Sequence, residues 1–301
     1  MTNIPILKAG DKVSIISTAR KVEPEEMKAA VGLLSGWGLR VVVPEGLYAA
    51  ENQFAGSDSH RARMLQEALD DSGIRAIFCA RGGYGTVRII DRIDFSRFAE
   101  SPKWIVGYSD VTVLHSHIHR HFGLPTLHAT MPIHMSAAPN ADTETLHDVL
   151  FGKKIDYSWE PHALDRAGEA EGVVVGGNLS ILYSLCGSPS AIDTKGKILL
   201  IEDLDEYLYH IDRMMRNLDR CGMLEGLAGL IVGGMTDMHD NKVPFGSTAE
   251  EIVSEVVSRY GFPVAFHAPF GHTVGANLAL PLGTKIRLSV SHLKKSRIFA
   301  S

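Results

Sequence analysis

Ser109 is one residue of this 301-residue sequence whose type and setting could do chemistry. It lies in the turn 107–110, Gly-Tyr-Ser-Asp, between a predicted strand and a predicted helix. Such a turn can lift a serine hydroxyl out of a sheet, and it places the next backbone N–H at a helix N-terminus, where negative charge is stabilised. The usual hydrolase signature has glycine two residues after the serine, whereas this chain has Val111. From the spacing alone, helix capping by Ser109 is the favoured interpretation.

A carboxylate and an imidazole follow two later predicted strands. Glu202 follows the apolar run 198–201, and a carboxylate there could orient a catalytic histidine and stabilise its imidazolium. The alternative is that the acidic turn 202–206 supplies favourable charge before a helix. His272 lies beside a glycine in a loop after another strand, where it could be a general base, with the nearby His267 as a competitor.

The three residues together have the logic of a catalytic triad. Functional residues in open α/β sheets gather at the carboxyl ends of strands. The order Ser109, Glu202, His272 also occurs in unrelated serine hydrolases, although geometry matters more than order. A serine hydroxyl is a weak nucleophile at neutral pH and needs a base, and the base needs an orienting partner.

A fourth feature is the glycine-rich loop 81–85, Arg-Gly-Gly-Tyr-Gly, at the end of a predicted strand. Glycines let backbone N–H groups approach a ligand closely. One interpretation is an oxyanion donor close to Ser109, and another is a phosphate cradle. The loop lacks both the Gly-Lys-Ser/Thr ending of a P-loop and the GxGxxG spacing, so nucleotide binding has little support.

Histidine and cysteine are the remaining candidates for metal binding or catalysis. Histidines alternate at positions 115, 117, 119 and 121, where only residues four apart share a helix face. The sequence has no HExxH motif, so we predict no metal site. Cys79 ends a predicted strand and could be a nucleophile, but its apolar neighbours favour a place in the core.

The composition excludes several classes of protein. With 45% hydrophobic and 22% charged residues, a net charge of −5 and a pI of about 6.3, the chain has an ordinary globular balance and no basic footprint of a nucleic-acid binder. Its three cysteines lack the spacing of a disulfide framework. Because the N-terminus shows no signal-peptide pattern and no stretch is long enough to span a membrane, we expect a cytoplasmic protein that binds neither membrane nor nucleic acid.

The apolar periodicity predicts alternating strands and helices in the first half of the chain. Short β-branched runs alternate with amphipathic segments, which implies a parallel sheet covered by helices. The predicted strands are 13–16, 39–43, 74–80 and 104–106, and the predicted helices are 24–37, 58–71 and 111–121.

The second half begins after a segment without clear periodicity. Residues 151–170 carry glycine, proline and mixed charges, so we expect them to link two domains. The fold class is then α/β, with an N-terminal parallel-sheet domain over 1–150 and a C-terminal mixed α/β domain over 171–301. In the second half, strands are predicted at 197–201, 227–232, 263–266 and 285–290, and helices at 207–219, 247–260 and from about 178.

Different short motifs are spread along nearly the whole chain. In chain order they are Ala9-Gly10-Asp11-Lys12-Val13, Phe54-Ala55-Gly56-Ser57-Asp58, Arg81-Gly82-Gly83-Tyr84-Gly85, Gly107-Tyr108-Ser109-Asp110-Val111-Thr112, Gly176-Gly177-Asn178-Leu179-Ser180, Ile201-Glu202-Asp203, the segment Tyr209 to Arg213, Gly271-His272 and Leu280-Pro281-Leu282-Gly283. Each is weak alone, but the ordered set is specific. On this set the sequence resembles the LD-carboxypeptidases, the muramoyltetrapeptide carboxypeptidase group of serine peptidases.

The resemblance implies a Ser-His-Glu triad of Ser109, His272 and Glu202 in a site between the two domains. It implies oxyanion donors at the backbone N–H groups of Gly83 and Asp110. The implied reaction cleaves the bond between an L-configured centre and a terminal D-amino acid, which releases D-alanine from the murein tetrapeptide during cell-wall recycling. The resemblance implies no metal or organic cofactor, and it implies a homodimer.

The peptide substrate is less sharply defined than the reaction. The terminal carboxylate needs a cationic partner, for which Arg81 is the candidate. Relatives that hydrolyse microcin-C-type peptidyl nucleotides are the alternative, and the compact stretch 203–271 favours recycling over immunity. The chain has Thr-Ala-Arg at 18–20, where relatives often have a Pro-Ser-Gly-like turn, so a substrate role of this loop does not follow from the resemblance.

Two hypotheses of other classes remain. One is a non-catalytic protein that binds a ligand between two α/β domains, which predicts that Ser109, Glu202 and His272 are not mutually within hydrogen-bond reach. The other is a cysteine-dependent amidohydrolase that uses Cys79, which thiol alkylation would inactivate.

Overall fold

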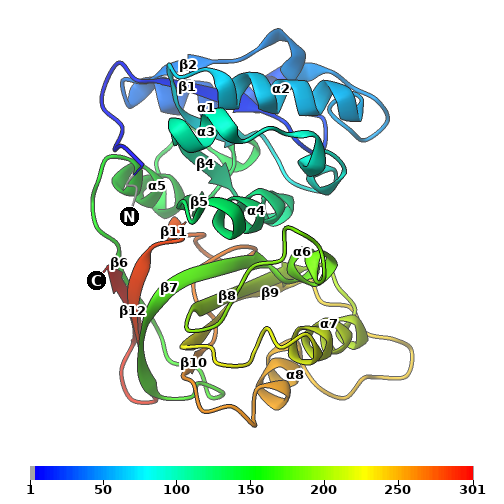
Figure 1. Ribbon diagram of the computed structural model, residues 1–301. Helices are drawn as coiled ribbons and strands as arrows, with labels where there is room; N and C mark the ends of the chain where they lie inside the picture. The colour runs from blue at the N-terminus through cyan, green and yellow to red at the C-terminus, as the bar shows by residue number, and fades with distance from the viewer. Residues whose placement is uncertain (1–3, 301) are drawn as a thin grey trace.

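Two β-sheets, one above the other in Figure 1, organise the chain in the computed structural model, which describes residues 4–300. The first sheet has the strand order β11-β5-β4-β3-β1-β2. Five of its strands are parallel, and β11 pairs antiparallel with β5. Its strands are β1 (Lys12–Ile16), β2 (Arg40–Val42), β3 (Ile74–Cys79), β4 (Trp104–Gly107), β5 (Thr126–His128) and β11 (Leu280–Leu282).

Helices cover both faces of the first sheet. Met27 of α1 and Leu146 of α5 pack in one apolar cluster, whereas Leu65 of α2, Phe98 of α3 and Leu114 of α4 pack in another on the opposite face. The strands are therefore apolar on both faces, as expected for a parallel sheet between helices. The helices are α1 (Pro24–Gly36), α2 (Asp58–Asp70), α3 (Ser96–Glu100), α4 (Thr112–Phe122) and α5 (Ala141–Leu150), with short 3-10 helices η1 (Glu45–Tyr48), η2 (Thr86–Arg88), η3 (Ile90–Arg92), η4 (Ser109–Val111) and η5 (Pro132–His134).

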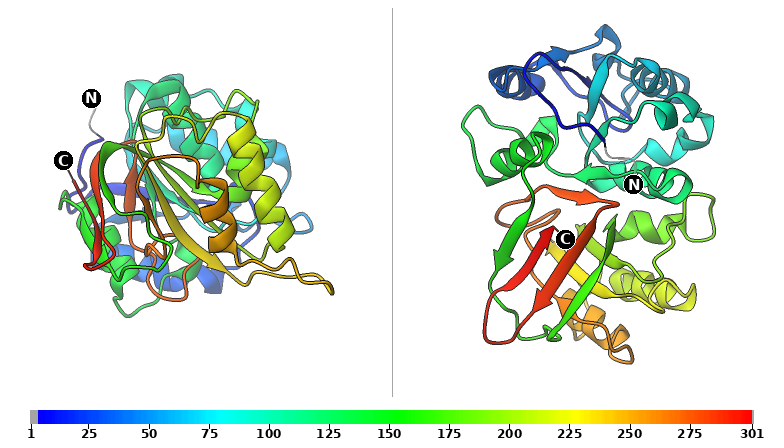
Figure 2. Two further views of the ribbon diagram at one scale, coloured as in Figure 1. Left: turned by 90° about the horizontal axis from the view of Figure 1, so that it is seen from below. Right: turned by 60° about the vertical axis from the view of Figure 1, so that its left-hand side comes forward.

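The second sheet is mixed, as predicted for the C-terminal half. Its strand order is β10-β9-β8-β7-β12-β13-β6, in which β7 to β10 are parallel and the other three pair antiparallel. The red C-terminal strands lie beside green strands from the middle of the chain in Figure 2. The strands are β6 (Asp156–Trp159), β7 (Gly168–Asn178), β8 (Ile198–Leu204), β9 (Gly229–Thr236), β10 (Val264–Ala265), β12 (Lys285–Val290) and β13 (Ser296–Ala300).

Three helices pack on one face of the second sheet. They are α6 (Leu179–Leu185), α7 (Leu208–Arg220) and α8 (Ala249–Val256). Helix α7 buries Ile211, Met214, Met215 and Leu218, the positions at helical spacing in the sequence, so the methionine pair belongs to the core. Thr248 caps α8 by accepting the backbone N–H of Glu251 at 3.2 Å. None of the helices described between residues 4 and 300 is both long and apolar enough to cross a membrane.

The sequence prediction missed the strands β5, β6, β11 and β13, and of these β11 joins the two halves. β6 lies inside the segment predicted as a link, and β11 of the C-terminal half extends the first sheet. β6 is an edge strand in which only Trp159 is fully buried, and β11 contains Pro281, so neither has a strong strand signature. One apolar cluster includes residues of both sheets, for example Val106 and Leu200, so the halves share a continuous core.

Candidate active site

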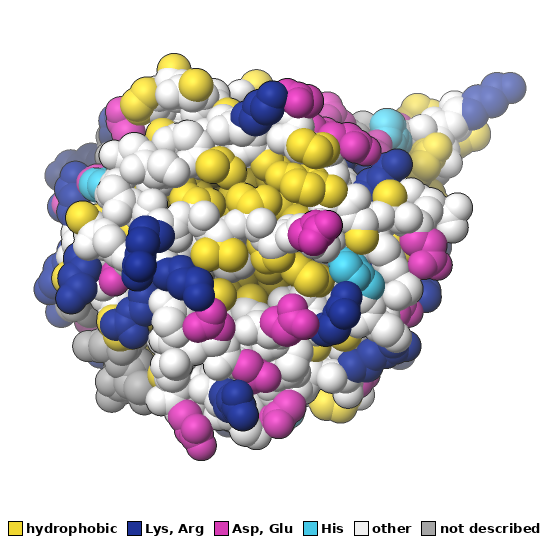
Figure 3. Space-filling model, turned by 90° about the horizontal axis from the view of Figure 1, so that it is seen from above, with side chains coloured by type: hydrophobic (Ala, Val, Ile, Leu, Met, Phe, Trp, Pro, Cys, Tyr) yellow, Lys and Arg dark blue, Asp and Glu magenta, His cyan; other side chains and the backbone are white. Residues whose placement is uncertain are grey.

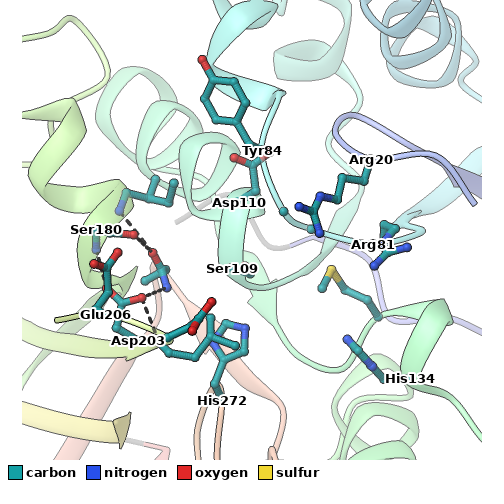
Figure 4. A pocket seen from close by; sticks show the side chains of 17 residues that line it. Arg20, Arg81, Tyr84, Ser109, Asp110, His134, Ser180, Asp203, Glu206 and His272 are labelled. Carbon is teal, nitrogen blue, oxygen red and sulfur yellow. Dashed lines mark hydrogen bonds between the residues drawn. The ribbon is translucent and has the colours of Figure 1, made fainter. Parts of the chain in front are cut away.

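A cavity of about 390 Å³ lies between the two halves of the chain. Figure 4 shows its labelled side chains. The first half contributes the loop 81–84 and Ser109, and the second half contributes Asn178, Asp203 and His272. The predicted nucleophile and the predicted base therefore face the same space.

The backbone at Ser109 has an unusual conformation. Its φ angle is 62°, in the left-handed region that non-glycine residues rarely adopt, at the junction of β4 and η4. Such a conformation costs of order 1–3 kcal/mol and persists where the surrounding structure holds it. The N-cap position of α4 is Val111, and no side chain caps it. The capping interpretation of Ser109 is therefore wrong, and the strained turn presents its side chain to the cavity instead.

The glycine-rich loop lies against this turn. A Cβ atom placed on Gly82 would be 3.0 Å from both Cβ and Oγ of Ser109, so glycine lets the loop lie closer to the Ser109 side chain than a larger residue would. The carboxylate of Asp110 accepts the backbone N–H of Thr86 at 2.9 Å and is almost fully buried. Burial raises the pKa of Asp110, and the hydrogen bonds from Thr86 and Gly85 oppose that rise.

A buried arginine holds the glycine-rich loop by hydrogen bonds to backbone carbonyls. Arg61 has no exposed side-chain surface, and its Nη1 donates to the carbonyls of Thr18 and Gly85 at 2.7 and 2.8 Å. The hydroxyls of Thr18 and Thr86 lie 2.8 Å apart, within hydrogen-bond distance. These contacts join the first loop of the chain to the glycine-rich loop, so both are held in place beside Ser109.

Glu202 and His272 form a buried pair. Glu202 lies within β8 and has no exposed side-chain surface, so it is not a solvent-facing charge before α7. The Nδ1–H of His272 donates to Glu202 Oε2 at 2.6 Å, and the His272 backbone N–H donates to the same oxygen at 3.0 Å. A Cβ on Gly271 would lie 2.3 Å from Glu202 Cγ, and Gly271 has φ 79°, which explains the glycine before the histidine.

The electrostatics of this pair suit a general base. Burial lowers the pKa of His272, but the hydrogen bond and charge of Glu202 outweigh it and raise the pKa above its ordinary value. Burial would raise the pKa of Glu202, but the two neighbouring imidazoles of His128 and His272 outweigh it and lower that pKa. With Nδ1 engaged by the carboxylate, Nε2 is the nitrogen left to exchange a proton with a substrate or nucleophile.

The geometry between base and nucleophile is open in this structure. Within residues 4–300, no hydrogen bond joins Ser109 to His272, although both side chains line the cavity. The binding-protein hypothesis predicted this missing contact, but it did not predict the Glu202–His272 hydrogen bond. Catalytic hydrogen bonds are often long before substrate binds. The competitor His267 does not contact Glu202. Its Nε2 lies 3.3 Å from Glu250 Oε1, and the centroid of its ring lies 4.3 Å from that of His162.

Charged side chains divide the cavity into two walls. Arg20 and Arg81 lie on one wall, and neither forms a salt bridge within the described residues. Asp203 and Glu206 lie opposite. Asp203 accepts from Asn178 Nδ2 and from the backbone of α6, each at 2.8 Å, while burial and the charge of Glu202 raise its pKa to about 7.

The other chemical candidates do not form sites. Cys79 is fully buried, and burial together with the charge of Asp110 raises its thiol pKa to about 12, so it lacks the thiolate that a nucleophile needs. His115 bonds to the Gly107 carbonyl at 2.9 Å, and His117 contacts Ser190. Among residues 4–300, no group of three or more histidine, cysteine or acidic side chains could hold a metal ion.

Comparisons with known proteins agree with this arrangement. Residues 13–129 match the family model described as LD-carboxypeptidase N-terminal domain, and residues 171–288 match LD-carboxypeptidase C-terminal domain. A Bacillus subtilis protein named probable murein peptide carboxypeptidase is 36% identical over 95% of this chain and 91% of its own length. The chain belongs to the LD-carboxypeptidase family. It is accordingly a serine-type carboxypeptidase by family, and its mixed α/β fold is the fold of that family.

Other LD-carboxypeptidase relatives cover the chain equally well. The Pseudomonas aeruginosa murein tetrapeptide carboxypeptidase is 28% identical over 94% of both chains. The crystal structure of muramoyltetrapeptide carboxypeptidase from Oxalobacter formigenes is 27% identical, with a TM-score of 0.87 over 96% of this chain and 99% of that chain. The microcin C7 self immunity protein, solved with aspartyl sulfamoyl adenosine, is 22% identical with a TM-score of 0.86 over 98% of each chain, which shows the shared fold alone.

Several cavity residues of this LD-carboxypeptidase were missed by the sequence analysis. Arg20 lines the cavity, although the departure at 18–20 gave no reason to expect a role there. Asp203 was noted only as part of an acidic turn, and His134 was not noted at all. The glycine pair 233–234 was also missed. A Cβ on Gly234 would lie 1.8 Å from the His272 carbonyl, so this pair lets the histidine loop pack on β9.

Proposed function

We propose that this protein is a serine carboxypeptidase that cleaves an L,D-peptide bond and releases D-alanine from the murein tetrapeptide. The observation that supports it most is the 2.6 Å contact between His272 Nδ1 and buried Glu202, beside a cavity that Ser109 also lines. A base with an orienting carboxylate next to a strained serine has the parts that acyl transfer needs. A non-catalytic binding protein would not need this pair.

In the proposed mechanism, His272 Nε2 takes the proton of Ser109 as its Oγ attacks the scissile carbonyl. Glu202 keeps the imidazole oriented and stabilises the imidazolium that forms. The protonated His272 then gives its proton to the leaving amine, and D-alanine departs. A water molecule, deprotonated by the same imidazole, attacks the acyl-enzyme and restores Ser109.

The oxyanion would be held by the backbone N–H groups of Gly83 and Asp110. Asp110 follows Ser109 directly, and Gly83 follows Gly82, whose Cα lies against the nucleophile. Each such donor is typically worth about 3–4 kcal/mol of transition-state stabilisation. The buried carboxylate of Asp110 fixes the loop to the turn through Thr86, so both donors would be set before substrate arrives.

The terminal carboxylate of the substrate would bind to Arg81, with Arg20 beside it. Both guanidinium groups line the cavity and lack acidic partners among residues 4–300. A guanidinium offers two parallel N–H donors to a carboxylate, which gives geometric selection as well as charge. This assignment places the D-amino acid on the arginine wall, so the acyl part of the peptide would extend toward Asp203 and Glu206.

The tetrapeptide is favoured as substrate by the relatives. Three of them bear names that refer to murein peptides or muramoyltetrapeptide, and they are 36%, 28% and 27% identical to this chain. The alternative is a peptidyl nucleotide of the microcin-C type, which the shared fold with the microcin C7 self immunity protein favours. The sequence identity to that protein is only 22%. The short stretch 203–271 also favours the tetrapeptide as substrate.

We also propose that the chain acts in the cytoplasm as a homodimer, with domains over 1–150 and 171–301 joined by 151–170. No metal or organic cofactor enters the proposed mechanism. Apolar side chains gather near the centre of the face seen from above in Figure 3, with charged groups around them. An apolar patch rimmed by charge is typical of protein interfaces, which supports the dimer.

The test is the release of D-alanine from purified murein tetrapeptide by the wild type and by Ser109→Ala. We expect turnover by the wild type and a rate about 10⁶-fold lower in the variant. Ser258→Ala, which removes an exposed hydroxyl just beyond α8, is the matched control and should keep full activity. A peptidyl adenylate in the same assay distinguishes the two substrates. Equal turnover by Ser109→Ala would rule out the assignment.

A further inference from the structure

Only one carboxylate oxygen of Glu202 has hydrogen-bond donors within residues 4–300. Oε2 accepts from the ring and the backbone of His272 at 2.6 and 3.0 Å, whereas Oε1 is buried without a partner. A buried acceptor left unsatisfied costs about 1–3 kcal/mol, and more when it is charged. The site therefore leaves room for a second donor to this carboxylate.

His128 is the side chain that faces the unpaired oxygen. Its Nε2 lies 3.8 Å from Glu202 Oε1, and both side chains are fully buried. Neither ring nitrogen of His128 has a hydrogen-bond partner among the described residues. An unpartnered donor thus faces an unpartnered acceptor, and a shift of about 1 Å in either side chain would complete the hydrogen bond.

The position of His128 in the sheets explains why it can reach this oxygen. It ends β5, where it pairs with Gly107 of β4 on one side and with Leu280 of β11 on the other. Gly107 leads directly into the Ser109 turn. Glu202 belongs to the other sheet, so the contact crosses from one half of the chain to the other.

We infer that His128 is a positioning residue for the Glu202–His272 pair, an inference that rests on the proposed function. As the neutral Nε2–H tautomer, His128 donates to Oε1 and fixes the rotation of the carboxylate. Oε2 then stays on the Nδ1–H of His272, and the negative charge is shared between two imidazoles. His128 takes no part in proton transfer, because it touches neither the cavity nor the nucleophile.

Other titratable groups surround this cluster and are the same in every variant compared below. They are His115 on α4, Tyr108 at the end of β4, His134 on η5, Asp142 on α5 and Asp203 on β8. The Tyr108 ring lies 5.8 Å from that of His128 and 4.8 Å from that of His272. A difference between variants at position 128 therefore isolates the donor itself.

The test compares His128→Gln with His128→Asn. The Gln amide nitrogen can occupy the place of Nε2, whereas the shorter Asn amide cannot reach Oε1. We expect the Gln variant to keep kcat within about threefold, and the Asn variant to lose about 10- to 100-fold in kcat with little change in KM, as for a lost hydrogen bond to a charged group. Without the His128 donor, the negative charge of Glu202 acts more strongly on His272 and raises its pKa further. The fall of kcat/KM at low pH should therefore move to higher pH in the Asn variant.

A second measurement does not depend on activity. The Nδ1–H proton resonance of His272, observed by NMR, should be alike in the wild type and His128→Gln, and shifted or broadened in His128→Asn. If the wild type releases no D-alanine but the resonances differ in this way, the proposed function fails and the inference stands.

Three results would overturn the inference. The first is that both variants match the wild type in kcat, pH limb and resonance. The second is that both lose activity equally, in step with a fall in Tm, which would indicate a purely structural role. The third is that Asn retains activity and Gln does not. If the Asn variant fails to fold, His128→Phe, which keeps the ring volume and removes both nitrogens, replaces it in the comparison.

Discussion

The two walls of the cavity are built on different principles. The first half supplies backbone geometry, with Ser109 at a positive φ and Gly82 packed against it. The second half supplies a buried side-chain pair, Glu202 and His272, joined at 2.6 Å. Around Ser109, the first wall thus depends on chain conformation and the absence of side chains, whereas the second depends on charge and hydrogen bonding.

This difference determines which kind of substitution disturbs each wall. Backbone N–H groups cannot be removed by an ordinary substitution, so the first wall is disturbed by adding atoms. The second wall is disturbed by removing a charge with little change in shape. Substitutions of these two kinds therefore test the comparison directly, and the predictions below run from the largest effect to the smallest.

Glu202→Gln should have the largest effect. It keeps the shape of the side chain but removes the charge that orients His272 and stabilises its imidazolium, so kcat should fall about 10⁴-fold. Steady-state D-alanine release is the measurement. Glu255→Gln, an exposed carboxylate on α8, is the control and should be unaffected.

The double variant Ser109→Ala/Glu202→Gln extends this test across the two walls. Since the residues act as one unit, it should be no slower than Ser109→Ala alone. Additive losses would mean that the two walls act independently.

Gly82→Ala disturbs the first wall. The new Cβ would meet Ser109 Oγ at 3.0 Å, so either the loop or the nucleophile must move. A displacement of this kind should lower kcat about 10- to 100-fold. Gly32→Ala on α1, where a Cβ meets nothing within 4 Å, is the control and should raise Tm slightly while activity stays unchanged. Unchanged kcat in Gly82→Ala would show that the close approach is irrelevant to the reaction.

Arg81→Gln tests the charge on the first wall. It should raise KM about tenfold with little change in kcat, because the carboxylate contact exists in both the ground state and the transition state. Replacing the terminal carboxylate of the peptide by an amide should weaken the wild type and leave the variant nearly unchanged. Arg63→Gln, an exposed arginine on α2, is the control. An equal penalty from the amide in wild type and variant would exclude Arg81 as the clamp.

The pH profile gives the smallest shift. His272 must be neutral to accept a proton, and its pKa is raised above 6.5 by Glu202, so kcat/KM should fall as pH drops through that raised value. In Glu202→Gln the residual limb should move to lower pH. Asp203, with a pKa near 7, titrates in the same range. If His272 is the group that titrates, Asp203→Asn should keep the fall of kcat/KM at low pH. Loss of that fall in the variant would assign it to Asp203 instead.

Local features could be predicted from the sequence, and contacts between distant residues could not. The turn at Ser109 and the loop 81–85 are contiguous motifs, and both lie where the parallel strands predicted them. The burial of Glu202 was not predictable, because it depends on β8 packing against Gly271 and on a hydrogen bond from His272, 70 residues later. Arg20 and His128 gave no signal for the same reason: each meets its neighbours only once the sheets are assembled.

The central claim is that Ser109 is acylated during turnover with Glu202 and His272 as its acid–base pair. Rapid acid quench of the enzyme with tetrapeptide, followed by peptide mass spectrometry, tests it most directly. We predict a mass increase equal to the tripeptide acyl group on the peptide that contains Ser109, absent in Ser109→Ala. Turnover with the adduct on the Cys79 peptide, or with no adduct in wild type while D-alanine appears in a burst, would contradict the claim.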